Sequence, residues 1–191
     1  SADDVVAKVA DAGGQVLMPP MDVMEFGRMA ILADPTGAAI GLWQPNSHPG
    51  ADVTNEPGSY CSSESLSNDL HAAIAFYASS VGWWVRTSDG PMPYTEFQVG
   101  GRSIAGMMAR PRMMPAEVPN HWGVYFAVAD LDAAVARVGE LGGSAFMGTI
   151  DTPAGRVAPV MDPTGASLNL MYGDFDTTVA VSNLDQSKRP D

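Results

Sequence analysis

The sequence contains a single cysteine, Cys61, among its 191 residues. One thiol forms no internal disulfide and cannot build a zinc site alone, which excludes a disulfide-stapled secreted scaffold. A lone cysteine in a strand-like segment is typically a small buried apolar residue, so we assign Cys61 no catalytic role. A reducing cytoplasmic location is the default expectation.

Basic residues are scarce, with 10 Lys and Arg against 22 Asp and Glu and a net charge of -12. Like-charge repulsion disfavours nucleic acid and anionic membranes as partners. The sequence also lacks the roughly 18 to 20 consecutive apolar residues that a spanning helix needs, and residues 1–20 lack a basic start followed by an apolar stretch. We therefore expect a soluble protein that binds neither nucleic acid nor a membrane.

Several enzyme signatures are absent from the sequence. There is no glycine-rich phosphate loop followed by Lys and Ser or Thr, no GxGxxG, no GxSxG and no HExxH. These absences exclude the enzyme classes that depend on those motifs.

An internal repeat is the clearest feature that is present. Residues 27–43 read GRMAILADPTGAAIGLW and residues 155–171 read GRVAPVMDPTGASLNLM, with nine of seventeen positions identical. A helical pattern that ends in paired glycines precedes each copy, at residues 5–14 and 133–143. Repeats of this kind indicate a protein built from similar modules.

Each module spans about sixty residues, because residues 69–77 (DLHAAIAFY) match residues 130–138 (DLDAAVARV) at an offset of 61. The pattern predicts a strand, a helix after an Asp N-cap, and three strands, the last two joined by an Asp-Pro-x-Gly turn. Alternation in residues 121–128 places Trp122 and Val124 on one face and His121 and Tyr125 on the other. The predicted fold class is α+β, with tandem βαβββ modules.

The repeat also predicts the domain organisation. Residues 1–44 form a partial module that lacks its first strand and its partner module, and residues 45–59, rich in Pro, Gly, Asn and Ser, form a linker. Residues 60–172 form a complete pair of modules and residues 173–191 a polar tail. Either a longer protein contains roughly 70 to 80 further residues ahead of the partial module, or another chain supplies them.

Several segments together resemble the vicinal-oxygen-chelate superfamily of glyoxalases, bleomycin-resistance proteins and extradiol dioxygenases. The resemblance rests on residues 58–69, 76–84 and 120–130 and on both GR…DPTGA segments. It is greatest to the two-pair actinobacterial group of antigens, glyoxalase-like proteins and hydroxylase components. It implies that paired modules curl their sheets into an open barrel, with a ligand or metal on the concave face.

The resemblance also implies where metal ligands would lie. One ligand position of the family lies seven residues before the Asp that caps the helix, which gives Ser62 and Gly123 in the two modules. The other lies seven residues after the Asp of the turn. Counting from Asp162 gives Asn169, and the matching position in the preceding module is near Ala105. Glycine and alanine have no ligand atom in their side chains, and serine and asparagine are weak neutral ligands for transition metals. We therefore expect no metal cofactor, with a divalent metal as the alternative.

Glu64 is the candidate catalytic residue, because a carboxylate in the middle of a strand whose neighbours point into a mainly apolar cavity is costly unless it is paired, and such groups often bind or catalyse. It would act as a general base or accept a hydrogen bond from a ligand, and the competing interpretation is an ion pair with Arg102 or Arg156. His121 could bind a ligand or form a hydrogen bond to a loop, and Tyr125 could donate a hydrogen bond.

The candidate ligand-binding residues share inward parity or a methionine side chain suited to adaptable pockets. They are Ser62, His121, Tyr125, Met107, Asn169 and Met171. We interpret the chain as a metal-independent protein that binds a small hydrophobic or aromatic metabolite and assists a hydroxylase. The alternatives are a metal-dependent glyoxalase-like lyase or extradiol-type dioxygenase, and a purely structural protein. Homodimerisation stays open.

Overall fold

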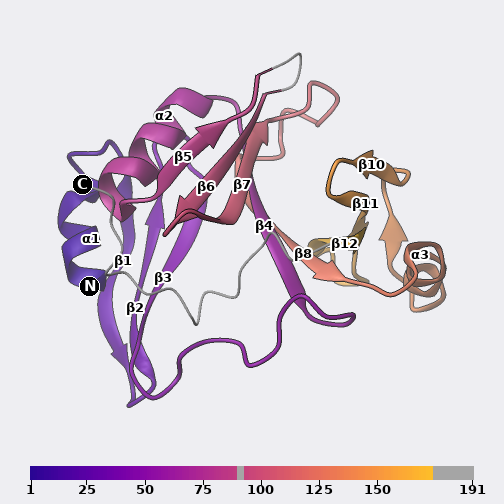
Figure 1. Ribbon diagram of the computed structural model, residues 1–191, viewed down its shortest axis with the longest axis horizontal. Coiled ribbons are helices and arrows are strands. Elements are labelled where there is room, and N and C mark those ends of the chain that lie inside the picture. The colour runs from indigo at the N-terminus through magenta and orange to yellow at the C-terminus, as the bar shows by residue number, and fades with distance from the viewer. Residues whose placement is uncertain (90–92, 174–191) are drawn as a thin grey trace. The chain divides into compact units, whose positions relative to one another are not determined.

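The computed structural model describes residues 1–89 and 93–173 (Figure 1). The predicted polar tail lies outside the described residues, apart from Gly173. The elements in chain order are α1 (Ala2–Val9), β1 (Gln15–Val23), β2 (Gly27–Ala33), β3 (Ala39–Pro45), β4 (Tyr60–Ser67), α2 (Leu70–Phe76), β5 (Trp84–Thr87), β6 (Tyr94–Val99), β7 (Arg102–Ala109), β8 (His121–Ala127), α3 (Leu131–Glu140), β9 (Ser144–Ala145), β10 (Ile150–Thr152), β11 (Gly155–Met161) and β12 (Ser167–Gly173). The predicted α+β class with βαβββ modules is confirmed.

The first complete module runs from β4 to β7. Its strands are ordered β4-β7-β6-β5, so the first strand pairs in parallel with the last. Helix α2 begins after Asp69, whose carboxylate accepts a hydrogen bond from the Ala72 amide. A π-helical turn, Tyr77–Val81, continues α2 and ends at Gly82, whose φ of 80° favours glycine.

The second complete module runs from β8 to β12 and repeats this topology. β12 pairs in parallel with β8 and antiparallel with β11, and β10 follows at the edge. Asp130 caps α3 by accepting a hydrogen bond from the Ala133 amide. The turn between β11 and β12 is the predicted Asp-Pro-x-Gly turn, in which one oxygen of Asp162 accepts from the Thr164 and Ala166 amides.

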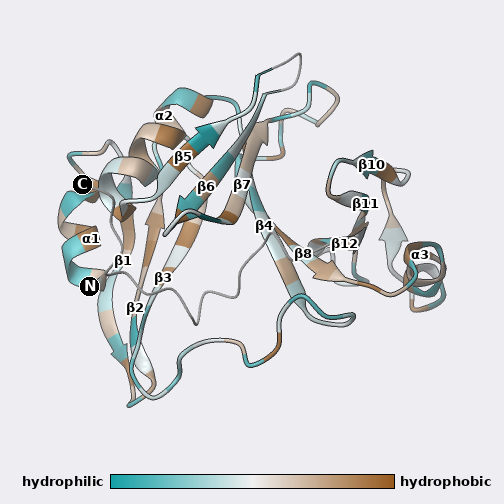
Figure 2. Cartoon of the chain, viewed as in Figure 1, coloured by the Kyte–Doolittle hydropathy of each residue, from teal (hydrophilic) through white to brown (hydrophobic). Residues whose placement is uncertain are grey.

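The N-terminal segment contains α1 and the antiparallel sheet β1-β2-β3. Helix α1 begins with a capping box in which Ser1 and Asp4 exchange hydrogen bonds. Both α1 and α2 carry mixed hydrophilic and hydrophobic residues along their length, as amphipathic helices do (Figure 2). In the described residues, β3 has β2 as its strand neighbour and no first strand beside it.

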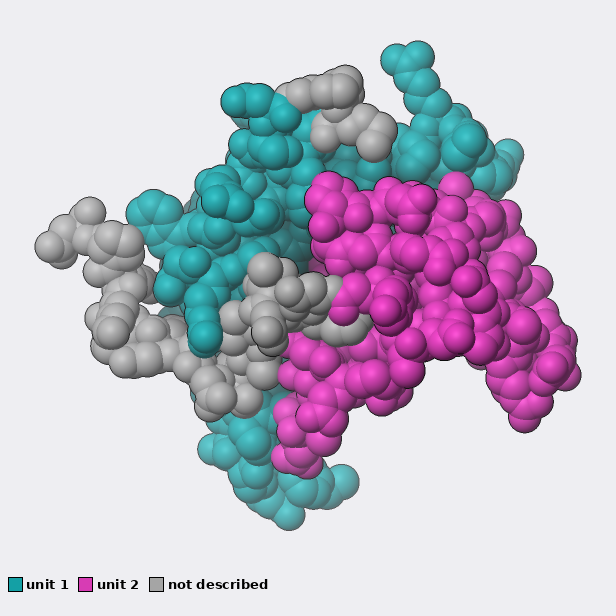
Figure 3. All heavy atoms as spheres, turned by 45° about the vertical axis from the view of Figure 1, so that its right-hand side comes forward, with its two compact units in different colours: residues 1–50, 64–122, 181–191 teal, residues 51–63, 123–180 magenta. Residues whose placement is uncertain are grey.

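The described chain packs as two compact units (Figure 3). Among the described residues, unit 1 contains residues 1–50 and 64–122, and unit 2 contains residues 51–63 and 123–173. The N-terminal segment therefore shares a core with the module of α2. The division falls within β4, between Ser63 and Glu64, because it follows packing rather than the sequence repeat.

The core of unit 1 is aromatic. Tyr77 is fully buried and stacks on Trp83 at a ring distance of 5.4 Å. Its hydroxyl donates a hydrogen bond to the buried carboxylate of Asp34 over 3.0 Å and accepts one from the Trp122 indole over 2.8 Å. Burying these polar groups is tolerated because each finds a partner. Unit 2 has its own core between α3 and β11 and β12, around Leu131, Val160 and Leu170.

No helix among residues 1–89 and 93–173 has both the length and the apolar character needed to cross a membrane.

Candidate ligand-binding site

The two faces of the β4-β7-β6-β5 sheet differ in chemistry. The face toward α2 buries Thr95, Phe97 and Met107, the last two in the core cluster of unit 1. Because successive side chains alternate, the opposite face carries the intervening residues. The strand register aligns four of these in one row across the sheet: Glu64, Gly106, Glu96 and Arg86.

Glu64 and Tyr94 form the centre of this second face. The Tyr94 hydroxyl donates a hydrogen bond to the Glu64 carboxylate. The two residues belong to β4 and β6, and β7 lies between those strands. Gly106 of β7 makes the contact possible, because a Cβ built there would overlap the Tyr94 hydroxyl oxygen and ring. We refer to Glu64, Tyr94 and Gly106 as the Glu64–Tyr94 site.

The electrostatic surroundings determine how Tyr94 behaves. Burial raises the pKa of its hydroxyl well above its ordinary value, and the charge and hydrogen bond of Glu64 raise this pKa further. The phenol therefore stays protonated and acts as a donor at physiological pH. Glu64 supplies an acceptor beside this donor.

The remainder of the face adds an ion pair and an exposed aromatic ring. Arg86 forms an ion pair with Glu96 over 3.1 Å, and the Gln98 amide donates to Glu96 over 3.2 Å. Trp84, paired across the strands with Gln98, is 55% exposed. An acceptor, a neutral phenol and an open indole together suit a flat aromatic molecule with a hydroxyl group.

The structure gives two of the predicted residues of unit 1 contacts of their own. His121 Nδ1 lies 2.8 Å from the Pro119 carbonyl oxygen, which is the loop contact considered as the alternative to ligand binding. Met107 is fully buried among core side chains on the α2 side of the sheet. Its neighbour Gly106, rather than Met107 itself, faces Glu64, so Met107 is not carried into the proposed site.

The other predicted residues belong to unit 2. Tyr125 and Met171 pack in one cluster with the buried Cys61, so the structure brings these two together. Asn169 pairs in register with Tyr125, and its side-chain amide donates to the Val124 carbonyl over 3.3 Å. Ser62 is half-buried in β4. Their predicted roles in ligand binding stay predictions.

The side chains at the family's metal positions do not suit a divalent ion. Within the described part of the chain, no group of three or more His, Cys, Asp or Glu could hold a metal. Ala105 is the position predicted by counting along the sequence, and it packs in the core. A register irregularity between Phe97 and Gln98 changes which residues of β7 face the core. Gly106 faces Glu64 instead and supplies no ligand atom.

Tyr94, Gly106, Glu96 and Arg86 are not among the residues predicted from the sequence. The alternation of β6, in which Thr95 and Phe97 are buried, could have placed Tyr94 and Glu96 on the face of Glu64. Gly106 had no comparable signal, because its role depends on the ring that lies above it.

Comparison with known proteins shows sequence similarity over most of the chain. A family model described as a glyoxalase-like domain matches residues 65–171. CFP32 of Mycobacterium tuberculosis, whose name describes it as a glyoxylase, is 42% identical over 172 residues, which are 88% of this chain and 65% of that protein. The anthracycline biosynthesis protein DauV of Streptomyces sp. strain C5 is 39% identical, over 89% of this chain and 62% of its own length. The chain thus spans slightly less than two thirds of these curated relatives.

Solved structures show the same fold at low sequence identity. The Mn(II)-bound glyoxalase from Novosphingobium aromaticivorans matches with a TM-score of 0.61 and 16% identity, over 97% of this chain and 66% of that one. The 2,3-dioxygenase LapB from Pseudomonas sp. KL28 matches with a TM-score of 0.60 and 12% identity, over 91% and 68% of the two chains. At these identities the likeness concerns the fold alone.

Proposed function

Because the chain belongs to the glyoxalase-like domain family, within the vicinal-oxygen-chelate superfamily, we propose that it binds a small hydroxylated aromatic metabolite at the Glu64–Tyr94 site without using a metal. The observation that carries this proposal is the Tyr94 hydroxyl held against the Glu64 carboxylate over Gly106. The ligand replaces or joins this hydrogen bond.

The geometry provides both halves of a recognition site for a phenol or enol. Glu64 accepts the ligand's hydroxyl proton in a hydrogen bond, and Tyr94, kept neutral, donates to an adjacent oxygen. A carboxylate positioned in this way also serves as a general base that removes a proton from an acidic O–H or C–H group. The exposed Trp84 ring offers a surface on which an aromatic ligand stacks.

The relatives support an aromatic metabolite as the ligand class. DauV and DnrV, from two Streptomyces strains, are 39% and 40% identical to this chain and are named for anthracycline biosynthesis. Anthracyclines contain fused aromatic rings with hydroxyl and carbonyl oxygens side by side, which match a paired acceptor and donor. We extend the proposal to a role beside a hydroxylase, in which the protein holds the substrate or product.

The metal-dependent alternative, a glyoxalase-like lyase or extradiol-type dioxygenase, finds support in the fold of the structural neighbours and, for the lyase, in the name of CFP32. The chemistry at the ligand positions argues against it, since Gly123 offers no side-chain ligand atom and Asn169 offers only a neutral amide oxygen, which is a weak ligand for transition metals. We therefore derive no reaction step through a metal.

The test is binding of 1,8-dihydroxyanthraquinone, a hydroxylated fused-ring probe, by isothermal titration calorimetry. Glu64→Gln keeps the size of the side chain and removes its charge, and Tyr94→Phe removes the donor. Each change should weaken binding about tenfold or more, because a hydrogen bond to a charged group contributes about 1.5 to 3 kcal/mol and about 1.4 kcal/mol corresponds to tenfold. Gly106→Ala should act similarly by displacing the Tyr94 ring.

Glu140→Gln, on the exposed surface of α3, is the matched control and should leave affinity unchanged. Circular dichroism of each variant checks that it is folded. Unchanged affinity in the Glu64 and Tyr94 variants would contradict the proposed site. Stoichiometric Ni, Zn, Fe or Mn after equilibration and desalting, measured by elemental analysis, would contradict metal independence.

A further inference from the structure

Glu96 belongs to a strand that lies between two side chains proposed to contact the ligand. Strands β7 and β6 separate β4, which carries Glu64, from β5, which carries Trp84. Adjacent strands lie about 4.8 Å apart, so β4 and β5 are about 14 Å apart. A flat molecule that binds Glu64 and reaches toward Trp84 therefore passes over β6 on the face that carries Glu96.

Two donors bond the Glu96 carboxylate. Arg86, its partner across the strands, forms an ion pair with it over 3.1 Å, and the Gln98 side-chain amide donates to it over 3.2 Å. Glu96 is the less exposed member of the ion pair, with 29% of its side chain exposed against 71% for Arg86. Because the more buried charge loses more hydration, Glu96 is the member that depends more on the pairing.

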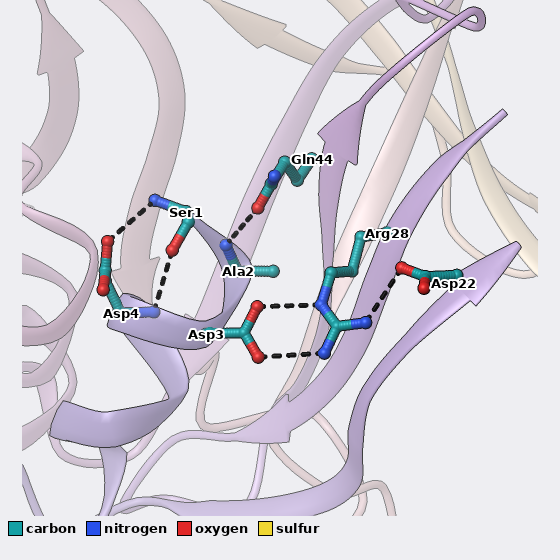
Figure 4. A network of polar contacts seen from close by, with 7 residues as sticks. All are labelled: Ser1, Ala2, Asp3, Asp4, Asp22, Arg28 and Gln44. Atoms are coloured by element: carbon teal, nitrogen blue, oxygen red, sulfur yellow. Dashed lines mark hydrogen bonds and ion pairs between the residues drawn. The ribbon is translucent and has the colours of Figure 1, made fainter. Parts of the chain in front are cut away.

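Arg86 is held by fewer contacts than Arg28, another arginine of unit 1. Arg28 bonds Asp3 through two nitrogens, over 2.8 and 2.9 Å, and Asp22 through a third over 2.8 Å (Figure 4). In the part of the chain that the structure describes, the ion pair of Arg86 is to Glu96 and uses one nitrogen, Nη2. Loss of the Glu96 carboxylate would therefore release the Arg86 guanidinium, whereas Arg28 would keep one partner after losing the other.

The charges in the row across this face oppose an anionic ligand. The row contains two carboxylates, of Glu64 and Glu96, and one guanidinium, of Arg86. At the Tyr94 hydroxyl, burial raises the pKa most, and the negative charges of Glu64 and then of Glu96 raise it further. A carboxylate on a ligand at the same place would meet the same repulsion.

We propose that Glu96 determines the charge specificity of the Glu64–Tyr94 site: by holding Arg86 in an ion pair, it lets uncharged hydroxylated aromatic molecules bind and disfavours aromatic carboxylates. The inference rests on the function proposed above and adds the residue that selects among aromatic ligands. Glu96 acts in two ways, because it repels an anion directly and keeps Arg86 from attracting one. An unfavourable charge against one ligand separates two affinities as well as a favourable contact with the other does.

The test compares two probes that share one ring system. They are 1,8-dihydroxyanthraquinone, which is uncharged at pH 7, and 1,8-dihydroxyanthraquinone-3-carboxylic acid, whose added carboxyl group is ionised at that pH. Isothermal titration calorimetry gives both dissociation constants, and the readout is the constant of the carboxylate divided by that of the uncharged probe. This ratio should be about five or more in the wild type and should fall about fivefold in Glu96→Gln, since an interaction between partly exposed charges changes affinity by up to about fivefold.

A double variant tests whether Glu96 acts through the guanidinium. In Glu96→Gln combined with Arg86→Gln, the released cation is missing, so the ratio should be higher than in Glu96→Gln alone. Equal ratios in the single and the double variant would show that Arg86 attracts no ligand carboxylate, and would overturn the proposal as stated.

Two control variants remove a carboxylate from other ion pairs. Glu140→Gln takes away the partner of Arg137 in α3, and Asp22→Asn takes away one partner of Arg28. Each makes the net charge of -12 less negative by one unit, as Glu96→Gln does, so the controls separate total charge from charge at the site. Both should keep the ratio of the wild type. A ratio that falls as far in the controls as in Glu96→Gln would overturn the proposal.

The outcomes separate this inference from the function on which it rests. Binding of the uncharged probe that depends on Glu64 and Tyr94, together with an unchanged ratio in Glu96→Gln, overturns the inference alone. Absence of binding of both probes to the wild type overturns the proposed function and the inference with it. If circular dichroism shows that Glu96→Gln does not fold, Glu96→Thr takes its place with the same expected ratio, since threonine favours strands.

Discussion

At the scale of single residues, burial determines which reactive side chains are available for chemistry. Cys61 is fully buried among Ala127, Val157 and Met171. Desolvation raises the pKa of its thiol from 9.0 to about 11. The residue therefore behaves as an apolar core side chain at neutral pH, and its thiolate is disfavoured as a nucleophile.

This pKa predicts a pH dependence of stability. A folded-state pKa above the unfolded value means that the neutral thiol favours the folded state below pH 9.0, and that this contribution is lost as the pH rises toward about 11. The difference in free energy of unfolding between the wild type and Cys61→Ala should therefore shrink across this range. Urea titrations at pH 8, 9.5 and 11 measure it, and a difference that does not change with pH would contradict the assigned burial.

At the scale of elements, the two copies of the Asp-Pro-Thr-Gly turn share local bonds and differ in what surrounds them. One carboxylate oxygen of Asp34 accepts from the Thr36 amide, the Thr36 hydroxyl and the Ala38 amide. Asp162 makes the equivalent three bonds. Asp34 is 3% exposed and also accepts from the Tyr77 hydroxyl, whereas the hydrogen bonds of Asp162 are exposed.

The pair of turns permits an internally controlled mutation. Asp34→Ala and Asp162→Ala remove the same local bonds, but the first also leaves the buried Tyr77 hydroxyl without its acceptor. Asp34→Ala should lower the free energy of unfolding by about 1 to 3 kcal/mol more than Asp162→Ala. Equal losses in urea denaturation would show that the bond to Tyr77 contributes nothing to stability.

At the scale of the whole molecule, repulsion among the charges that make up the net charge of -12 destabilises the compact folded state. The salt bridges that the structure describes are largely exposed, and such pairs contribute little each. Screening by salt should therefore relieve more repulsion than it weakens attraction.

Raising KCl from 0.05 to 0.5 M at pH 7.5 should increase the melting temperature. Relief of about 1 kcal/mol corresponds to about 2 to 4 °C in a chain of this size. Near the isoelectric point of about 4.4 the net charge vanishes and the increase should disappear. Calorimetry at both pH values measures the effect, and a melting temperature that falls with salt at pH 7.5 would indicate that local ion pairs dominate.

The sequence alone contains the information on local structure and on the repeated module. The aspartates that cap α2 and α3, the glycines that end the helices and the Asp-Pro-x-Gly turns act over a few residues, so their spacing predicts the elements. The repeat predicts that each module combines a helix with a sheet, and the parity of β4 identifies Glu64 as a carboxylate on the face opposite the core.

Tertiary structure decided which side chains meet. Tyr94 reaches Glu64 across β7, a contact that depends on strand order, on register and on the missing side chain of Gly106. Counting along the sequence predicted a ligand position at Ala105 on the same face as Glu64. Because of an irregularity in the β6–β7 register, the Ala105 side chain packs in the core instead. A shift of one residue exchanges the two faces of a strand. The partners of Glu64 therefore follow from long-range pairing, which no local pattern in this sequence encodes.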